Sequence, residues 1–175
     1  MTVSLQQRYA PEGRCFGCGP ANPEGLRIES FAAGDELVCE WMPELHHEAF
    51  AGVLNGGIIG ALLDCHCNWT AGWHLMRRDS AAGPPLTVTA EYTVKLRRPT
   101  PTDRPVRLTA KAASSDGPRV TVEATITADG KVTATFSGRF VAVGPDHPAT
   151  RHGLGPYSGP PASGRPSAGR QGSTG

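Results

Sequence analysis

Hydrophobic and polar residues alternate through most of the chain after Pro85. The apolar positions recur at every second residue in four segments, which span about 87–97, 106–112, 119–126 and 132–140. A period of two is typical of antiparallel strands with one dry and one wet face. Turn residues separate the last three segments, at 115–118 and at Asp129-Gly130, which is a hairpin signal. The second part of the chain therefore predicts an antiparallel sheet.

The segment 56–77 shows no such alternation, because its apolar residues fall on nearly every face of a helix. A helix that is apolar all round is buried, and one of this length is about 30 Å long. Asn55 suits the N-cap, and Arg77 and Arg78 suit the negative end of the helix dipole. Upstream, short strands are expected over about 26–32 and 35–41. The pattern predicts an α+β fold in which an antiparallel sheet wraps around one long central helix.

Composition divides the chain of 175 residues into a domain, 1–143, and a tail, 144–175. The tail holds 8 of the 22 glycines and 6 of the 16 prolines, and it is expected to be disordered. Residues 1–25 form a turn-rich leader to the domain. The net charge of +1 argues against nucleic-acid binding through a broad basic face. No apolar run suits a membrane span or a signal peptide, so the expected location is cytoplasmic.

The run from Gly52 to Gly57 and the acidic Asp64 resemble the signature of hotdog-fold acyl-CoA thioesterases. The nearest resemblance is to the phenylacetate-pathway type, in which a Gly-Gly pair is followed by an acidic residue eight positions after its first glycine. Gly56 and Asp64 have that spacing, and Tyr92 with Arg98-Pro99 matches a later strand and turn. The resemblance covers about residues 14–143. It implies the hotdog fold and a thioester substrate, acyl-CoA or an acyl carrier, with no cofactor.

The resemblance also implies catalytic roles for residues on the central helix. Thioester hydrolysis needs a donor for the developing oxyanion and a group that activates water or attacks the carbonyl. The Gly56 amide at the helix start, capped by Asn55, is the expected donor, and Asp64 the expected general base or nucleophile. Asp64 could instead be a structural carboxylate. About 12 Å of helix separates the two, so a site that uses both needs a second subunit; a homodimer or a dimer of dimers is expected.

Asn68 and Thr89 are the other candidates for the catalytic set. Asn68 lies one helical turn after Asp64 and could bond to it or to substrate; a satisfied buried amide is an equal alternative. Thr89 lies ten residues before Pro99, where some members of the resembled family place a catalytic Ser or Thr. Strict alternation, however, puts Thr89 on the opposite face of its strand from Val88.

Five residues are candidates for substrate binding. Gly57 opens the helix start to a carbonyl oxygen, and His47 lies in the loop before that helix. Arg97 and Arg98 end a strand and could meet the phosphates of coenzyme A, although a solvated basic edge is the alternative. Trp69 shares a helix face with Trp73, which favours core packing first and an acyl-pocket wall second.

Two positions depart from the family pattern, and one of them leaves a second function open. Ala49 stands where the resembled family often has the Asn or Gln that helps to position thioester or water, and Asn55 stands in place of a His. His46, His47 or Glu48 could substitute from the same loop. The alternative is a protein that binds acyl thioesters without hydrolysing them.

The five cysteines raise the question of a metal site. Cys15 and Cys18 form one Cys-x-x-Cys pair, and Cys65-His66-Cys67 adds further potential ligands. A structural zinc site typically needs four. Cys65 and Cys67 diverge by about 200° on a helix and cannot both bind one ion. No metal site is therefore predicted, and free thiols are expected.

Overall fold

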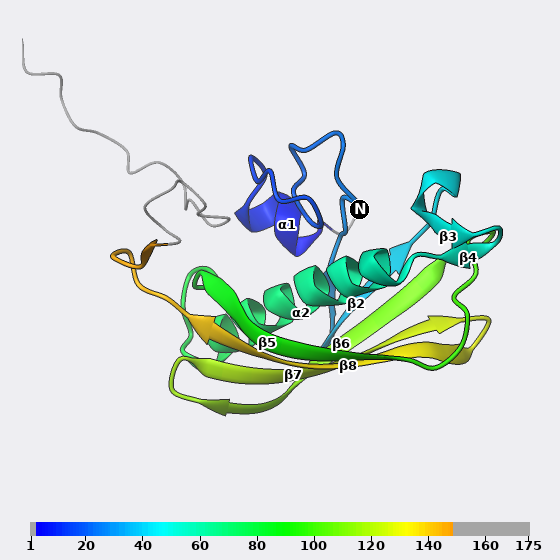
Figure 1. The fold of residues 1–175 in the computed structure, drawn as a ribbon. Coiled ribbons are helices and arrows are strands. Elements are labelled where there is room, and N and C mark those ends of the chain that lie inside the picture. The colour runs from blue at the N-terminus through cyan, green and yellow to red at the C-terminus, as the bar shows by residue number, and fades with distance from the viewer. Residues whose placement is uncertain (1–2, 149–175) are drawn as a thin grey trace, which may run out of the picture.

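The computed structural model describes residues 3–148, so most of the predicted tail lies outside the described residues. Six strands form one antiparallel sheet in the order β1-β2-β6-β7-β8-β5. Their bounds are β1 Phe31–Ala33, β2 Glu36–Trp41, β5 Thr87–Leu96, β6 Val106–Asp116, β7 Arg119–Ala128 and β8 Lys131–Ala142. The long helix α2, Gly56–Arg78, lies in the curve of this sheet (Figure 1). The predicted α+β architecture, a sheet wrapped around one central helix, is confirmed.

Both hairpins between the long strands occur where the sequence predicts them. Gly117-Pro118 joins β6 to β7, and Asp129-Gly130 joins β7 to β8. Gly117, Asp129 and Gly130 have positive φ, between 50° and 71°. That conformation is common only for glycine and, less often, for Asp or Asn, which explains why these residues make tight turns.

The core fills the space between α2 and the sheet. Ile59, Leu62 and Leu63 of the helix pack with inward-facing side chains of the strands, among them Leu108 and Phe140. Each of these five residues is at most 3% exposed. The helix therefore has the buried environment that its apolar pattern predicts.

One strand breaks the strict alternation. The pairing of β5 with β8 shifts between Thr89 and Glu91, so that Ala90 has no partner and forms a β-bulge. A bulge adds one residue to a strand and reverses which face the following side chains occupy. Thr89 pairs with the inward-facing Phe140, and Val94 packs on the same core. Thr89 still faces away from Val88, as alternation predicts, but the bulge separates Val88 from Val94, so that Thr89 and not Val88 lies on the helix side of the sheet.

The leader covers the side of α2 that faces away from the sheet (Figure 1). It contains a short helix, α1, Leu5–Tyr9, which the sequence analysis did not predict. Leu5 and Ala10 form a second apolar cluster with Leu37, Trp69 and Trp73. The leader is therefore an integral layer of the domain.

A buried polar network fastens the leader to the helix and to the sheet. Gln6 exchanges hydrogen bonds with Ser30, whose hydroxyl lies 2.8 Å from Nδ1 of His66. Nε2 of His66 lies 3.1 Å from the Leu37 carbonyl, so Nε2 donates and Nδ1 accepts. Burial lowers the pKa of His66 to about 4, which keeps the ring neutral.

The segment 26–32 is largely not a strand, contrary to the sequence analysis. Leu26 and Ile28 alternate into the core, but their amides donate to the carbonyls of Phe16 and Gly17 in the leader. Arg27 between them has a φ of 53°, which breaks the extended backbone. Side-chain alternation without strand pairing produced the wrong prediction here. Among residues 3–148 no helix is both long and apolar enough to cross a membrane.

Candidate active site

The start of α2 presents backbone amides toward the surface. Oδ1 of Asn55 accepts from the amides of Gly57 at 2.7 Å and Ile58 at 3.4 Å, so Asn55 is the N-cap that the sequence predicts. No acceptor in the described part of the chain receives the Gly56 amide. A free amide at the positive end of a helix dipole can donate to an anionic oxygen.

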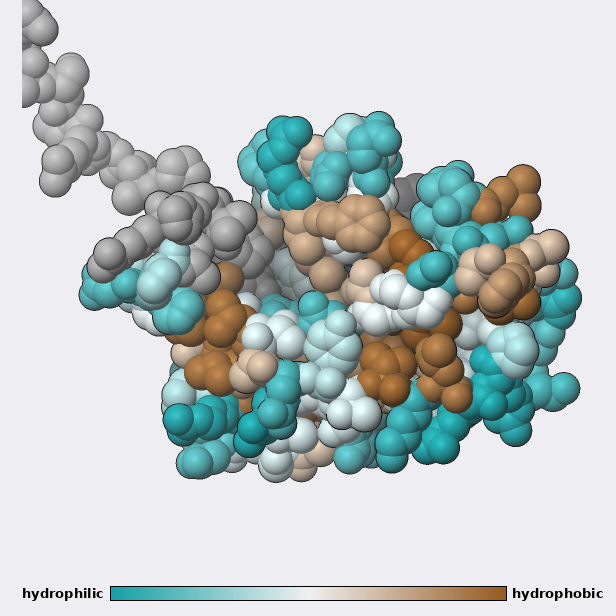
Figure 2. Space-filling view, viewed as in Figure 1, coloured by the Kyte–Doolittle hydropathy of each residue, from teal (hydrophilic) through white to brown (hydrophobic). Residues whose placement is uncertain are grey.

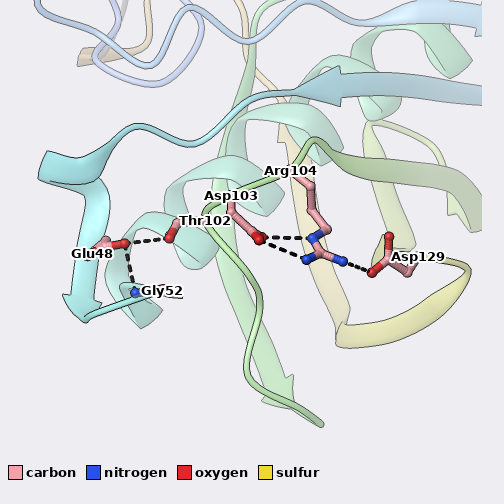
Figure 3. Close-up of polar contacts among 6 residues, drawn as sticks. All are labelled: Glu48, Gly52, Thr102, Asp103, Arg104 and Asp129. Carbon is pink, nitrogen blue, oxygen red and sulfur yellow. Dashed lines mark hydrogen bonds and ion pairs between the residues drawn. The ribbon is translucent and has the colours of Figure 1, made fainter.

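A small hairpin holds this helix start in place. The strands β3, Glu48–Phe50, and β4, Val53–Leu54, pair just before α2. The Glu48 carboxylate accepts from the Gly52 amide at 2.9 Å and from the Thr102 hydroxyl at 2.6 Å (Figure 3). The Leu54 amide donates to the Thr100 carbonyl. The hairpin is therefore tied to the loop between β5 and β6.

The same loop is braced on its other side. Arg104 makes a two-point contact with Asp103 at 2.8 Å and also bonds to Asp129 in the β7–β8 turn (Figure 3). All three side chains are substantially exposed, so this ion pairing stabilises the loop only modestly. The sequence analysis did not foresee either the Glu48–Thr102 bond or this network, since the partners are far apart in the chain.

Asp64 faces β5 from the middle of α2, half-buried. The Thr89 hydroxyl donates to Oδ1 of Asp64 at 2.8 Å. Burial raises the pKa of Asp64, the Thr89 hydrogen bond acts in the opposite direction, and Cys15 adds a smaller upward effect. The structure thus brings together two of the predicted catalytic residues, which are 25 positions apart in the sequence.

Asn68 does not bond to Asp64. Its side-chain amide donates to the Thr87 carbonyl at 3.1 Å, and its Oδ1 accepts from the Thr87 hydroxyl at 2.8 Å. Both polar atoms of the Asn68 side chain are therefore bonded to β5, as the hypothesis of a satisfied buried amide predicts. Asn68 fixes the distance between α2 and the strand that carries Thr89.

His47 and Trp69 lie away from the Asp64–Thr89 pair. His47 is buried against Trp41, and its Nδ1 accepts from the Glu44 amide at 2.9 Å. Burial and the neighbouring His46 lower the pKa of His47. Trp69 is 2% exposed in the cluster beneath the leader, and its indole N–H donates to Sγ of Cys18 at 3.3 Å. This position agrees with the first hypothesis for Trp69, core packing, rather than with a wall of the acyl pocket.

The two arginines occupy different environments. The Arg98 guanidinium donates to the Val132 carbonyl on β8 at 2.8 Å. Arg97 lines a shallow groove of about 690 Å³ together with Lys95 and Thr93. These residues alternate with Val94, which packs on the core, so the groove lies on the sheet face turned away from α2. A role for Arg97 and Arg98 in binding phosphate stays a prediction.

The free edge of the sheet lies beside both halves of the site. β5 ends the strand order, and Tyr92 and Leu96 on it are 47% and 58% exposed. Leu96 approaches Gly56, since a Cβ added at Gly56 would lie 3.5 Å from its Cδ1. Figure 2 shows hydrophobic surface along this edge. An exposed apolar edge strand is a ready surface for pairing with another chain.

Among known proteins, only solved structures match this chain. No protein-family model matches the chain, and no curated protein does. Solved structures match with high probability. A thioesterase superfamily protein from Shewanella loihica PV-4 is 25% identical over 71% of this chain and 98% of its own, with a TM-score of 0.59.

Two further structures are described by their link to phenylacetic acid degradation. The PaaI protein of that operon in E. coli is 16% identical over 68% of this chain and 81% of its own, with a TM-score of 0.58. A phenylacetic acid degradation-related protein from Ralstonia eutropha JMP134 is 18% identical over 79% and 99%, with a TM-score of 0.60. The predicted hotdog fold and its likeness to the structures of thioesterase superfamily proteins are confirmed.

Proposed function

We propose that this protein hydrolyses acyl thioesters, acyl-CoA or an acyl-carrier thioester, at a site shared between two subunits. The observation that carries the proposal is the hydrogen bond from Thr89 to the half-buried carboxylate of Asp64. Acyl transfer needs a base or nucleophile and a donor to the oxyanion. The Asp64 carboxylate can supply the first, and the free amide at the start of the same helix can supply the second. The likeness to thioesterase structures supports the same reaction class.

In the proposed reaction Asp64 acts as general base or as nucleophile. As a base, its carboxylate takes a proton from water while the water oxygen attacks the thioester carbon. The Gly56 amide donates to the oxyanion that forms on the carbonyl oxygen. The carbon–sulfur bond then breaks, and the thiolate leaves and takes up a proton. Thr89 holds the carboxylate in position and favours its ionised form, as its effect on the pKa of Asp64 indicates.

Geometry requires the second subunit in this proposal. Eight residues of helix separate Gly56 from Asp64 by about 12 Å, too far for one carbonyl to touch both. Pairing of β5 with its copy in a two-fold dimer would bring the start of one α2 toward the middle of the other. The exposed Tyr92 and Leu96 on that edge support this arrangement.

Binding without hydrolysis is the second candidate. Ala49 has no side-chain amide to position water, and two of the three candidate replacements in the same loop are bonded elsewhere. The Glu48 carboxylate is bonded to Gly52 and Thr102, and Nδ1 of His47 is bonded to Glu44.

Steady-state hydrolysis of a panel of aliphatic and aromatic acyl-CoA thioesters decides between the two candidates. Asp64→Asn is expected to lower kcat by about 10² or more, as loss of a catalytic base or nucleophile does. Asp116→Asn, at the exposed end of β6, is the matched control and should keep wild-type activity. If the wild type binds the panel but hydrolyses none of it, the binding function is correct instead.

A further inference from the structure

Three cysteine thiols converge beside α2. Cys15 and Cys18 come from the leader, and Cys65 comes from the helix, next to Asp64. Their sulfur atoms all lie within 4.8 Å of one another, and the Cys15 and Cys65 sulfurs are 3.7 Å apart. Cys67 lies elsewhere, fully buried in the main core, and His66 is bonded to Ser30 and Leu37. The helix therefore adds one thiol, Cys65, to the Cys15–Cys18 pair; the sequence analysis named Cys65 as a potential ligand but predicted no metal site.

The spacing of the sulfurs suits a bound metal ion. Zinc–sulfur bonds of about 2.3 Å at tetrahedral angles place two ligand sulfurs about 3.8 Å apart. A disulfide needs its sulfurs at about 2.05 Å. The observed 3.7 Å between Cys15 and Cys65 is a thiol–thiol hydrogen bond in the metal-free chain, and it also matches the separation of two ligands of one ion.

Two glycines make room for this arrangement. A Cβ at Gly17 would lie 2.3 Å from Sγ of Cys65, so only glycine lets that thiol approach the leader. A Cβ at Gly19 would lie 2.4 Å from the Cys15 nitrogen and 2.6 Å from the Gly13 carbonyl oxygen. The Cys-x-x-Cys-Gly turn closes through a bond from the Gly19 amide to the Cys15 carbonyl at 2.9 Å.

One sulfur atom also receives a hydrogen bond from outside the cluster. The Trp69 indole N–H donates to Sγ of Cys18 at 3.3 Å. Donors around ligand sulfurs orient them and compensate their negative charge when a metal is bound.

We propose that Cys15, Cys18 and Cys65 bind a zinc ion that fastens the leader to α2 beside Asp64. Thiolates select soft or borderline cations such as Zn²⁺ over Mg²⁺ and Ca²⁺. Three protein ligands leave a fourth position for water or an external donor. Because Cys15 is exposed, an ion can reach the cluster from solvent. Binding releases the thiol protons and stabilises the folded state, since the unfolded chain does not hold the three sulfurs together.

Metal content tests this proposal without any substrate, so its outcome is independent of the proposed function. The full-length chain is purified in reducing buffer, titrated with zinc, freed of excess metal and analysed by elemental mass spectrometry. One zinc per chain is expected for the wild type and for Cys67→Ala, a cysteine outside the cluster. Cys15→Ser and Cys65→Ser should each lose the bound zinc.

Cobalt substitution identifies the ligands directly. The cobalt-loaded wild type should show a thiolate-to-cobalt charge-transfer band in the near ultraviolet, which Cys15→Ser should lack while retaining wild-type circular dichroism. Zinc should raise the Tm of the wild type and leave that of Cys15→Ser unchanged. A folded, fully reduced wild type that retains no zinc after titration would overturn the proposal, as would full zinc retention by Cys15→Ser.

Discussion

Ala90 decides which face of β5 carries the Thr89 hydroxyl. Its bulge shifts the pairing with β8, so that Thr89 points toward α2 and reaches Asp64. Without the extra residue, the alternation set by Val94 and Leu96 would turn Thr89 away from the helix. One unpaired residue therefore creates the contact on which the proposed chemistry depends.

Removal of the Thr89 hydroxyl tests that contact. Thr89→Val keeps the shape of the side chain but leaves Asp64 without its donor. Because hydrogen bonds to charged groups contribute about 1.5–3 kcal/mol, kcat/KM should fall by about 10- to 100-fold. Thr89→Ser keeps the hydroxyl and should retain most of the activity. Equal rates for the Val and Ser variants in a thioesterase assay would show that the hydroxyl does not matter.

His47 makes stability depend on pH. Its pKa is lowered in the folded protein, chiefly by burial, from the ordinary value of 6.5. The unfolded state therefore binds the proton more readily, and the stability that His47 contributes is present above pH 6.5 and lost as the pH falls below that value. Protonation of Nδ1 would also turn the acceptor of the Glu44 amide into a donor and so break this hydrogen bond.

Chemical denaturation of the wild type and His47→Gln at about pH 7.5 and about pH 5.5 measures this effect. Gln is the usual partner of an N-cap amide at this position, so it can replace the acceptor without titrating. The wild type should lose more free energy of unfolding on acidification than the variant does. Equal losses of free energy of unfolding in the two proteins would show that protonation of His47 does not cause the acid destabilisation.

At the level of elements, the start of α2 is the part that the proposed chemistry uses most directly. Asn55 already has the extended backbone, φ −63° and ψ 135°, that a residue before proline prefers. Proline at the first helical position is well tolerated and has no N–H. A Cβ at Gly56 meets only Leu96, at an ordinary contact distance of 3.5 Å.

Gly56→Pro should therefore remove the oxyanion donor and keep the helix. Loss of one such donor costs about 10²–10³ in kcat. Gly56→Ala retains the amide and should stay close to wild type in kcat, with both variants showing wild-type circular dichroism. A Pro variant as active as the Ala variant would exclude the Gly56 amide from the reaction.

The sequence specifies elements better than it specifies contacts between them. Alternation located the four long strands, and Asn55 located the helix start, because both signals are local. The bulge at Ala90 and the convergence of Cys15 with Cys65 depend on packing between distant segments, so no local pattern contains them. Leu26 and Ile28 alternate like a strand yet bond to the leader, since period two reports burial rather than pairing partners.

On the scale of the whole molecule, the exposed edge at β5 is expected to join two copies. Sedimentation velocity at micromolar concentration should find a dimer. Leu96→Lys places a charge on that edge and should weaken the dimer and the activity together. Met42→Lys is the matched control, because Met42 is 52% exposed and comes directly after β2, which three strands separate from β5. This variant should keep both the dimer and the activity. A wild-type monomer would rule out a shared site.

Complementation between two inactive variants tests the shared site most directly. Asp64→Asn and Gly56→Pro subunits, co-expressed with different tags, form mixed dimers. If each site takes Asp64 from one subunit and the Gly56 amide from the other, every mixed dimer has one intact site. Random pairing then restores about one quarter of wild-type activity. If each site lies within one subunit, every site keeps a defect, and no recovery in the purified mixed dimers would contradict the shared-site thioesterase.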